Sequence, residues 1–277
     1  MEETKVEAVI SLLDDQDNAV WENIRKTILE AGIDLLPRLI KEQQSNQNPI
    51  VQDRTDILIR TLHFGKLKTQ LQNWKDHNSN DLLEGMLFLA SYENPGIEHH
   101  VFEHVLDQLY AKAWVNLGAS SSPMEKIKLF NGAFFDSLGF RPAHPDKFHY
   151  LENSLIDVVF EKRRGNPISL CIIYMLIAQK MKIPVYGVNL PNLFVLIHDD
   201  PEVRFYINVF NRGSIFTRHE IDAFLARLGI ESIPPYYEPC NHEAIVRRVL
   251  RNMMVSYEQR KQPERVREIY ELLEIWE

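Results

Sequence analysis

The cysteine that could act as a nucleophile in this chain is Cys171, which follows a Gly165-Asn166-Pro167 turn. Cys171 is four residues after Pro167, so on a helix it would lie one turn deeper, about 6 Å along the axis. An apolar environment at that depth raises the pKa of a thiol and makes it unreactive. We therefore expect a structural cysteine. A cysteine-dependent acyl-transferase, amidase or protease that uses Cys171 as fallback nucleophile is the alternative.

A second pattern with chemical potential is the pentapeptide from His100 to His104, which spells H-x-x-E-H. Some zinc hydrolases carry this pattern on a helix, with both histidines on one face. Such a site also needs a third ligand and a substrate cleft. The same residues suit the solvent face of an amphipathic helix, so we expect no metal and no other cofactor. A zinc hydrolase using His100, Glu103 and His104 is the weaker alternative.

The turn that precedes Cys171 could hold a ligand. Asn166 is expected to cap the following helix, and Pro167 fits its first position, where the missing N–H costs nothing. An arginine just before a helix N-terminus can bind a carboxylate or a phosphate. The candidate ligand-binding residues are Asn153, Arg163, Arg164, Gly165 and Asn166. The competing interpretations are a solvated charge cluster for the arginines and a loop-stabilising amide for Asn153.

The elements around this turn are predicted from hydrophobic periodicity. Residues 168–181 are almost all apolar and indicate a buried helix. Residues 185–190, 193–198 and 203–210 follow the alternation typical of strands. We expect His198 to be a solvated residue at the turn after its strand, on the opposite face from Leu193. We expect Ser169 to serve in capping or packing. Thr217 and Glu220 form a capping box for a helix over 217–228.

Helices are predicted on both sides of this central region. The pattern in residues 1–77 resembles a HEAT-like helical hairpin, and residues 82–89, 101–114 and 124–138 also have helical spacing. A loop is expected at 118–123 and irregular structure at 141–150. Residues 242–277 predict two helices separated at Gln262-Pro263, similar to one tetratricopeptide unit. The expected domains are 1–80 (helical), 81–230 (core) and 231–277 (linker and helical hairpin).

Composition narrows the class of partner. The 277 residues carry a net charge of −8, which argues against a general nucleic-acid binder. Two cysteines are too few for a disulfide framework and suit a reducing compartment. The acidic N-terminus is no secretory signal, and no apolar run reaches the ~18 residues needed to span a membrane. We expect a cytoplasmic protein that binds neither nucleic acid nor membrane.

One long stretch resembles a known family. Its elements are LFNGAFFDSLGF, YLENSLIDVVFEKRRGNPISL, KIPVYGVNLPNLFVLI and FYINVFNRG, between residues 129 and 213. They are similar to the transglutaminase-like proteins of the SirB type, and the resemblance extends over about residues 82–277. It implies a predominantly helical α+β fold in which a central helix packs against a small antiparallel sheet. It also implies flanking helices and a C-terminal tetratricopeptide-like segment.

The superfamily is best known for a Cys-His-Asp triad, and this chain departs from it at all three positions. By the resemblance, the cysteine falls on Pro167, the histidine on Leu193 and the aspartate on Asn208. Proline offers no nucleophile, and leucine can neither accept nor donate a proton. We therefore expect a non-catalytic binding, scaffold or regulatory module with a protein or peptide partner. If the assignment is right, the three positions line one cleft.

Overall fold

The computed structural model describes residues 3–115 and 122–277. The predicted loop at 118–123 thus lies mostly outside the described residues. The chain divides into two compact units, residues 1–73 and 74–277. The first unit contains a three-helix arrangement and most of a long fourth helix, and the second contains the sheets.

The first unit has a core of its own. Its helices are α1 (Glu3–Ser11), α2 (Asn18–Ala31), α3 (Leu36–Ser45) and the part of α4 (Pro49–His77) up to residue 73. Asp17 caps α2 by accepting a hydrogen bond from the N–H of Ala19 at 2.8 Å. The most deeply buried side chains of this core include Ile28, Leu39 and Leu58. The all-helical prediction for this region is confirmed.

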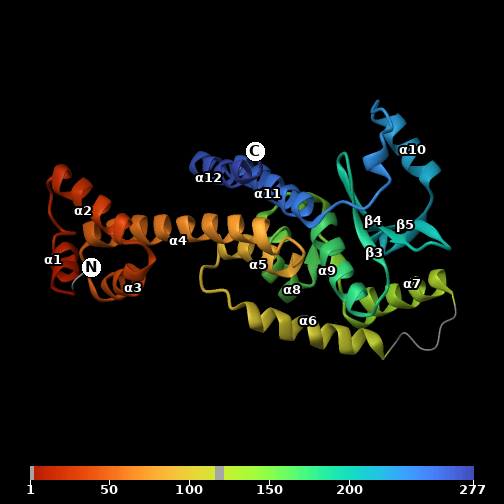
Figure 1. The fold of residues 1–277 in the computed structure, drawn as a ribbon, viewed down its shortest axis with the longest axis horizontal. Helices are drawn as coiled ribbons and strands as arrows, with labels where there is room; N and C mark the ends of the chain where they lie inside the picture. The colour runs from red at the N-terminus through yellow and green to blue at the C-terminus, as the bar shows by residue number, and fades with distance from the viewer. Residues whose placement is uncertain (1–2, 116–121) are drawn as a thin grey trace. The chain divides into compact units, whose positions relative to one another are not determined.

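The second unit is mainly helical (Figure 1). Its helices are α5 (Leu82–Ser91), α6 (His99–Trp114), α7 (Pro123–Gly132), α8 (Ile156–Lys162), α9 (Pro167–Lys180), α10 (Arg218–Arg227), α11 (His242–Gln259) and α12 (Pro263–Leu273). α7 continues as a π-helical turn over Ala133–Ser137. α11 and α12 pack together, and α11 also contacts α5, α9 and β3. The predicted helix break at Gln262-Pro263 is confirmed.

A four-stranded antiparallel sheet has the order β3 (Val185–Leu190), β4 (Leu193–Asp199), β5 (Arg204–Asn208) and β6 (Ser214–Phe216). A separate parallel pair joins β1 (Arg141–Pro142) to β2 (Arg164–Gly165). α9 contacts β3 and β4, and Figure 1 shows α10 on the other side of these strands. This arrangement confirms the predicted α+β fold with a central helix against an antiparallel sheet.

Side chains alternate between the two faces of the sheet. One face carries an apolar cluster that includes Val195, Ile197 and Tyr206 with Ile221 and Leu225 of α10. Residues of the other parity on β4, such as Phe194 and Leu196, are therefore directed to the face that α9 covers. The sheet is buried on both faces, which is why its strands have few polar residues.

The boundaries of β4 and β5 differ from the prediction, with β5 beginning at Arg204 instead of residue 203, and three short strands were not predicted. β5 stops at Asn208 because the Asn208 side chain accepts a hydrogen bond from the N–H of Asn211 at 3.1 Å and caps a 3₁₀ turn. β4 continues one residue further, to Asp199. β6, β1 and β2 have only two or three residues each, too few to produce a recognisable period. Among the described residues, no helix is long and apolar enough to cross a bilayer.

Candidate functional site

The turn in front of α9 is fixed by a buried network. Asn166 is 3% exposed, and its Oδ1 accepts a hydrogen bond from the N–H of Ser169 at 3.0 Å. Its Nδ2 donates to Ser154 Oγ at 2.8 Å. The Ser169 hydroxyl donates to the carbonyl of Asn153 at 2.7 Å. The expected cap, the proline at the first helical position and the packing role of Ser169 are all confirmed.

The two arginines of this turn have different environments. Arg163 adopts a left-handed conformation (φ 55°) and places its guanidinium 4.8 Å from the Phe140 ring centroid, and burial lowers its pKa. Arg164 is exposed and lies in β2. Gly165 is buried so closely that an added Cβ would lie 2.4 Å from Ser169 Oγ. Of this turn, Arg164 therefore offers its charge to solvent, whereas the Arg163 guanidinium packs on an aromatic ring.

Cys171 is fully buried within α9, as expected. Its thiol donates to the carbonyl oxygen of Phe194 at 3.7 Å. Burial raises the pKa of Cys171 strongly, and a hydrogen bond from the backbone of Val209 offsets only part of that effect. The other thiol, Cys240, is partly buried, and burial raises its pKa to about 11. Both groups are protonated at neutral pH, which makes them poor nucleophiles.

Leu193 and Asn208 line one groove of about 380 Å³ on the α10 side of the sheet. Most of the other lining residues come from β6 and α10 and include Ile215, Phe216 and Phe224; Leu190 of β3 and Asn211 complete the lining. Pro167 does not line this groove. It is half-buried at the start of α9, and α9 packs against β4 and the 3₁₀ turn after Asn208. The expectation that all three positions line one cleft is therefore wrong: Leu193 and Asn208 lie on the α10 side of the sheet, whereas Pro167 begins the helix that covers the other side.

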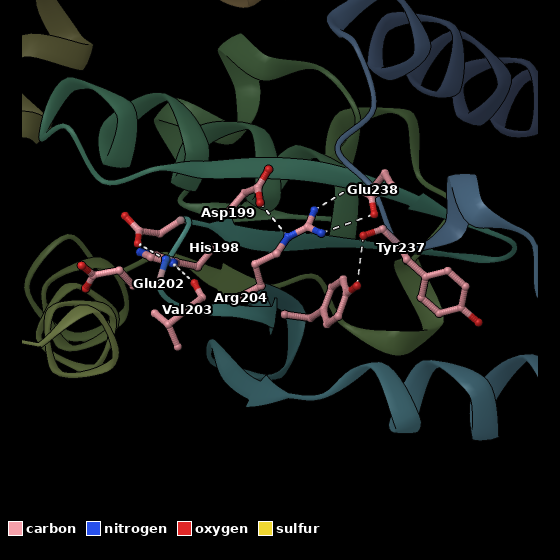
Figure 2. A network of polar contacts seen from close by, with 9 residues as sticks. His198, Asp199, Glu202, Val203, Arg204, Tyr237 and Glu238 are labelled. Atoms are coloured by element: carbon pink, nitrogen blue, oxygen red, sulfur yellow. Dashed lines mark hydrogen bonds and ion pairs between the residues drawn. The ribbon is translucent and has the colours of Figure 1, made fainter.

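The prediction of a solvated His198 is wrong. This residue is 2% exposed and stacks on Phe205 with ring centroids 4.8 Å apart. Its Nδ1 lies 3.2 Å from the carbonyl oxygen of Val203 (Figure 2). Because β4 extends to Asp199, His198 lies inside the sheet and not at the turn. The prediction that it faces away from Leu193 is confirmed: Leu193 packs with the cluster on the α10 face, whereas His198 lines a separate groove with Met181 and Ile183.

The polar residues that follow His198 are paired with each other. Figure 2 shows the guanidinium of Arg204 between Asp199 and Glu238, with nitrogen–oxygen distances of 2.6 Å to each carboxylate. These ion pairs connect β4 and β5 to the segment that precedes α11. Asp199 and Arg204 therefore tie the ends of two strands to the C-terminal region.

The H-x-x-E-H residues lie on the first turns of α6. His100 lies 3.5 Å from the Glu98 carboxylate and has a side-chain exposure of 76%. His104 Nε2 lies 2.9 Å from Gln108 Nε2. Within residues 3–115 and 122–277, no group of three His, Cys, Asp or Glu side chains converges on a point where a metal could bind. These histidines belong to an exposed helix face.

A larger groove, of about 690 Å³, lies beside the turn in front of α9. Two of the five candidate ligand-binding residues, Asn153 and Arg164, line it, whereas Arg163, Gly165 and Asn166 do not. The Asn153 amide also donates to the carbonyl of Lys147 and so holds the loop, as expected for a structural role. The rest of the lining was not predicted from the sequence and comprises Ala143, His144, Asp146, Lys147, Tyr150, Glu152 and Lys162.

The groove residues that were not predicted have only a weak signal in the sequence. Lys162 adjoins the two arginines already noted, but Lys147 and Tyr150 lie in a proline-containing segment without periodicity. Two features bring this segment to the turn. The N–H of Arg141 donates to the carbonyl of Arg163, and the N–H of Ala143 donates to that of Gly165, both at 2.8 Å.

A central helix that packs on an antiparallel sheet defines a class of folds. Comparison with known protein families identifies this class. A family model described as the transglutaminase-like superfamily matches residues 100–251, which is more than half of the chain. The protein therefore belongs to the transglutaminase-like superfamily.

Its curated relatives come from bacteria and animals. A UPF0162 protein of Xylella fastidiosa is 26% identical over 188 residues, which cover 66% of each chain. A UPF0162 protein of Vibrio cholerae is 28% identical over 155 residues, 54% of this chain and 56% of the relative. Mouse F-box only protein 21 is 25% identical over 225 residues, 69% of this chain and 34% of the relative. The chain thus spans just under two thirds of the Xylella relative. No solved structure matches the chain significantly.

Proposed function

We propose that this chain is a non-catalytic, SirB-type member of the transglutaminase-like superfamily that acts as a binding or scaffold module. The observation that carries the proposal is the chemistry of three positions. Pro167, Leu193 and Asn208 stand where the family pattern requires a nucleophile, a base and an orienting carboxylate. No proton relay can operate through a pyrrolidine ring, an alkyl chain and an amide.

The contacts of Cys171 show how α9 packs beside these positions. Its sulfur contacts the backbones of Phe194 and Val209, which immediately follow Leu193 and Asn208. The Leu193 and Asn208 side chains themselves line the groove on the α10 face of the sheet, so Pro167, at the start of α9, does not share a cleft with them. The proposal therefore rests on the residue types at the three positions and not on a retained triad geometry.

The residues at the start of α9 stabilise the helix and do not favour a reactive thiolate there. A nucleophilic cysteine needs an exposed helix N-terminus with free N–H donors to favour the thiolate. Here the Asn166 side chain accepts a hydrogen bond from the N–H of Ser169, and Pro167 has no N–H to donate. The nearest sulfur on the same helix, that of Cys171, is closed off by burial.

The flanking regions fit a module that presents surfaces to a protein partner. We assign residues 1–80 to a HEAT-like region, 81–230 to the transglutaminase-like domain and 231–277 to a linker and tetratricopeptide-like hairpin. A region similar to this chain forms about one third of mouse F-box only protein 21, as expected for a module used within longer chains. Two free cysteines agree with a reducing compartment, for which we propose the cytoplasm.

Thiol reactivity tests the non-catalytic assignment against the cysteine-enzyme alternative. The Cys240→Ser variant leaves Cys171 as the sole thiol, and the Cys171→Ala variant leaves Cys240. Both are treated with iodoacetamide at pH 7.5 and followed by intact mass. We expect Cys171 to stay unmodified in the native protein and to react fully in guanidinium, since burial and a raised pKa both protect it.

Selective modification of native Cys171 within minutes would overturn the proposal, because only an accessible thiolate reacts at that rate. Cys240 serves as the internal reference for a partly buried thiol whose pKa is raised to about 11.

A further inference from the structure

The 690 Å³ groove beside the turn in front of α9 carries more positive than negative free charge. We call it the basic groove and define it by Lys147, Tyr150, Asn153, Lys162 and Arg164. Lys147, Lys162 and Arg164 are exposed. Within the described part of the chain, none of these three cations forms an ion pair within 4.0 Å; Lys147 instead lies over the ring of Tyr150, 5.9 Å from its centroid.

One of the two carboxylates of the groove is already paired with an arginine. Glu152 accepts from Arg260 at 2.9 and 3.0 Å. Burial alone would raise the pKa of Glu152, but a hydrogen bond from its own backbone, the Arg260 guanidinium and the charge of Lys162 together hold it below its usual value. Asp146 is exposed, and its carboxylate lies 3.3 Å from His144 Nδ1, a contact that is an ion pair only when His144 is protonated; three cations thus face one carboxylate that has no permanent cationic partner among the described residues. The groove therefore keeps cations available for a charged ligand.

The basic groove is also built on a fixed frame. The N–H of Asn166 and the hydroxyl of Ser169 both donate to the carbonyl of Asn153, at 3.2 and 2.7 Å. The Asn153 amide donates to the Lys147 carbonyl, and the β1–β2 pair holds Arg164 in register with Arg141. The segment with Lys147 and Asn153 and the segment with Arg164 form two walls of the groove, and both are connected to the start of α9. A preorganised site loses less entropy when it binds a ligand.

We propose that the basic groove binds an acidic peptide segment of a partner protein, with Lys147, Lys162 and Arg164 contacting its carboxylates. The Tyr150 ring, 50% exposed, offers an apolar surface to the peptide backbone and side chains. A long nucleic acid would extend beyond the groove onto a chain of net charge −8, which repels it. A short acidic segment contacts only the groove. This inference deepens the proposed binding function and rests on it.

Fluorescence anisotropy with a fluorescein-labelled hexaglutamate peptide tests the proposal on the full chain. We expect saturable binding that weakens as salt rises from about 50 to about 500 mM, because exposed charges are screened at high ionic strength. Hexaglutamine should bind at least about tenfold more weakly. The Lys162→Gln and Arg164→Gln variants should each lose about threefold in affinity, and the double variant about tenfold.

The matched control is the Lys26→Gln/Lys128→Gln double variant, which removes two exposed charges from α2 and α7, outside the groove. It should bind hexaglutamate like the unmodified chain, and circular dichroism should show that every variant keeps its helix content. Lys162 and Arg164 are exposed, so their removal should not unfold the chain.

Three results would overturn the inference. The first is equal affinity of the groove double variant and the unmodified chain for hexaglutamate, and the second is equal affinity of the chain for hexaglutamine and hexaglutamate. The third is competition by inorganic phosphate or hexathymidylate that is as effective as competition by unlabelled hexaglutamate. The last would assign the groove to phosphate chemistry. None of these affects the thiol experiment, and a reactive Cys171 would in turn refute the non-catalytic proposal without changing the affinity of the groove.

Discussion

Substitution of Asn166 by alanine tests whether the turn in front of α9 holds the second unit together. In the folded chain, Asn166 Oδ1 caps the helix through the N–H of Ser169, and Nδ2 donates to Ser154 Oγ. Asn166, Ser169 and Ser154 are each at most 3% exposed, so water cannot replace either hydrogen bond. The Asn166→Ala variant therefore leaves two buried polar groups without one of their partners.

The expected cost follows from these two contacts. Loss of a helix N-cap costs about 1 kcal/mol, up to about 2 in a protein host. A buried hydroxyl that loses its partner adds about 1–2 kcal/mol. The total is about 3 kcal/mol. For a unit of about 200 residues, this corresponds to a Tm lower by about 6–12 °C.

Asn241 provides the matched control, because it caps α11 with the same geometry. Its side chain accepts from the N–H of Ala244 at 2.9 Å, but it is exposed. The Asn241→Ala variant should cost only about 1 kcal/mol, or about 2–4 °C, since water can solvate the N–H that is released. Differential scanning calorimetry of both variants measures the difference. Equal Tm losses would show that burial of the α9 turn adds nothing and would refute the reasoning.

Two further variants probe packing and charge in the same unit. Gly165→Ala should destabilise the fold by about 1–3 kcal/mol, because the added Cβ would collide with Ser169 Oγ. Gly132→Ala is the control and should be neutral or stabilising, because no atom lies within 4 Å of its added Cβ. Urea unfolding compares the two variants, and a neutral Gly165→Ala would contradict the observed packing. Asp157→Asn should stabilise the chain at pH 7, because burial raises the pKa of this carboxyl and its Oδ1 has no hydrogen-bond partner in the described chain. The folded state binds the Asp157 proton more tightly than the unfolded state. The gain in stability of the variant should therefore be full above the pKa of Asp157 in the folded chain and disappear below its pKa in the unfolded chain. A gain in stability that persists at pH 3 would disprove the titration argument.

The local features of the site could be predicted well from the sequence. The cap at Asn166, the proline at position 167 and the buried Cys171 follow from residue types over one helical turn, and each is confirmed. His198 was mispredicted because its environment depends on one extra residue of β4 and on stacking against Phe205 of the next strand. Cross-strand contacts of that kind leave no signal in the local pattern.

The sequence by itself determined the residue types at three positions: a proline at 167, a leucine at 193 and an asparagine at 208 cannot themselves supply a nucleophile, a base or an orienting carboxylate. It also determined the central helix and most of the sheet, since periodicity and capping act over a few residues. Only the tertiary structure decided which side chains share a surface. Lys147 and Arg164 are 17 positions apart in the sequence and line one groove because hydrogen bonds between the backbones of β1 and β2 join two segments that have no common period.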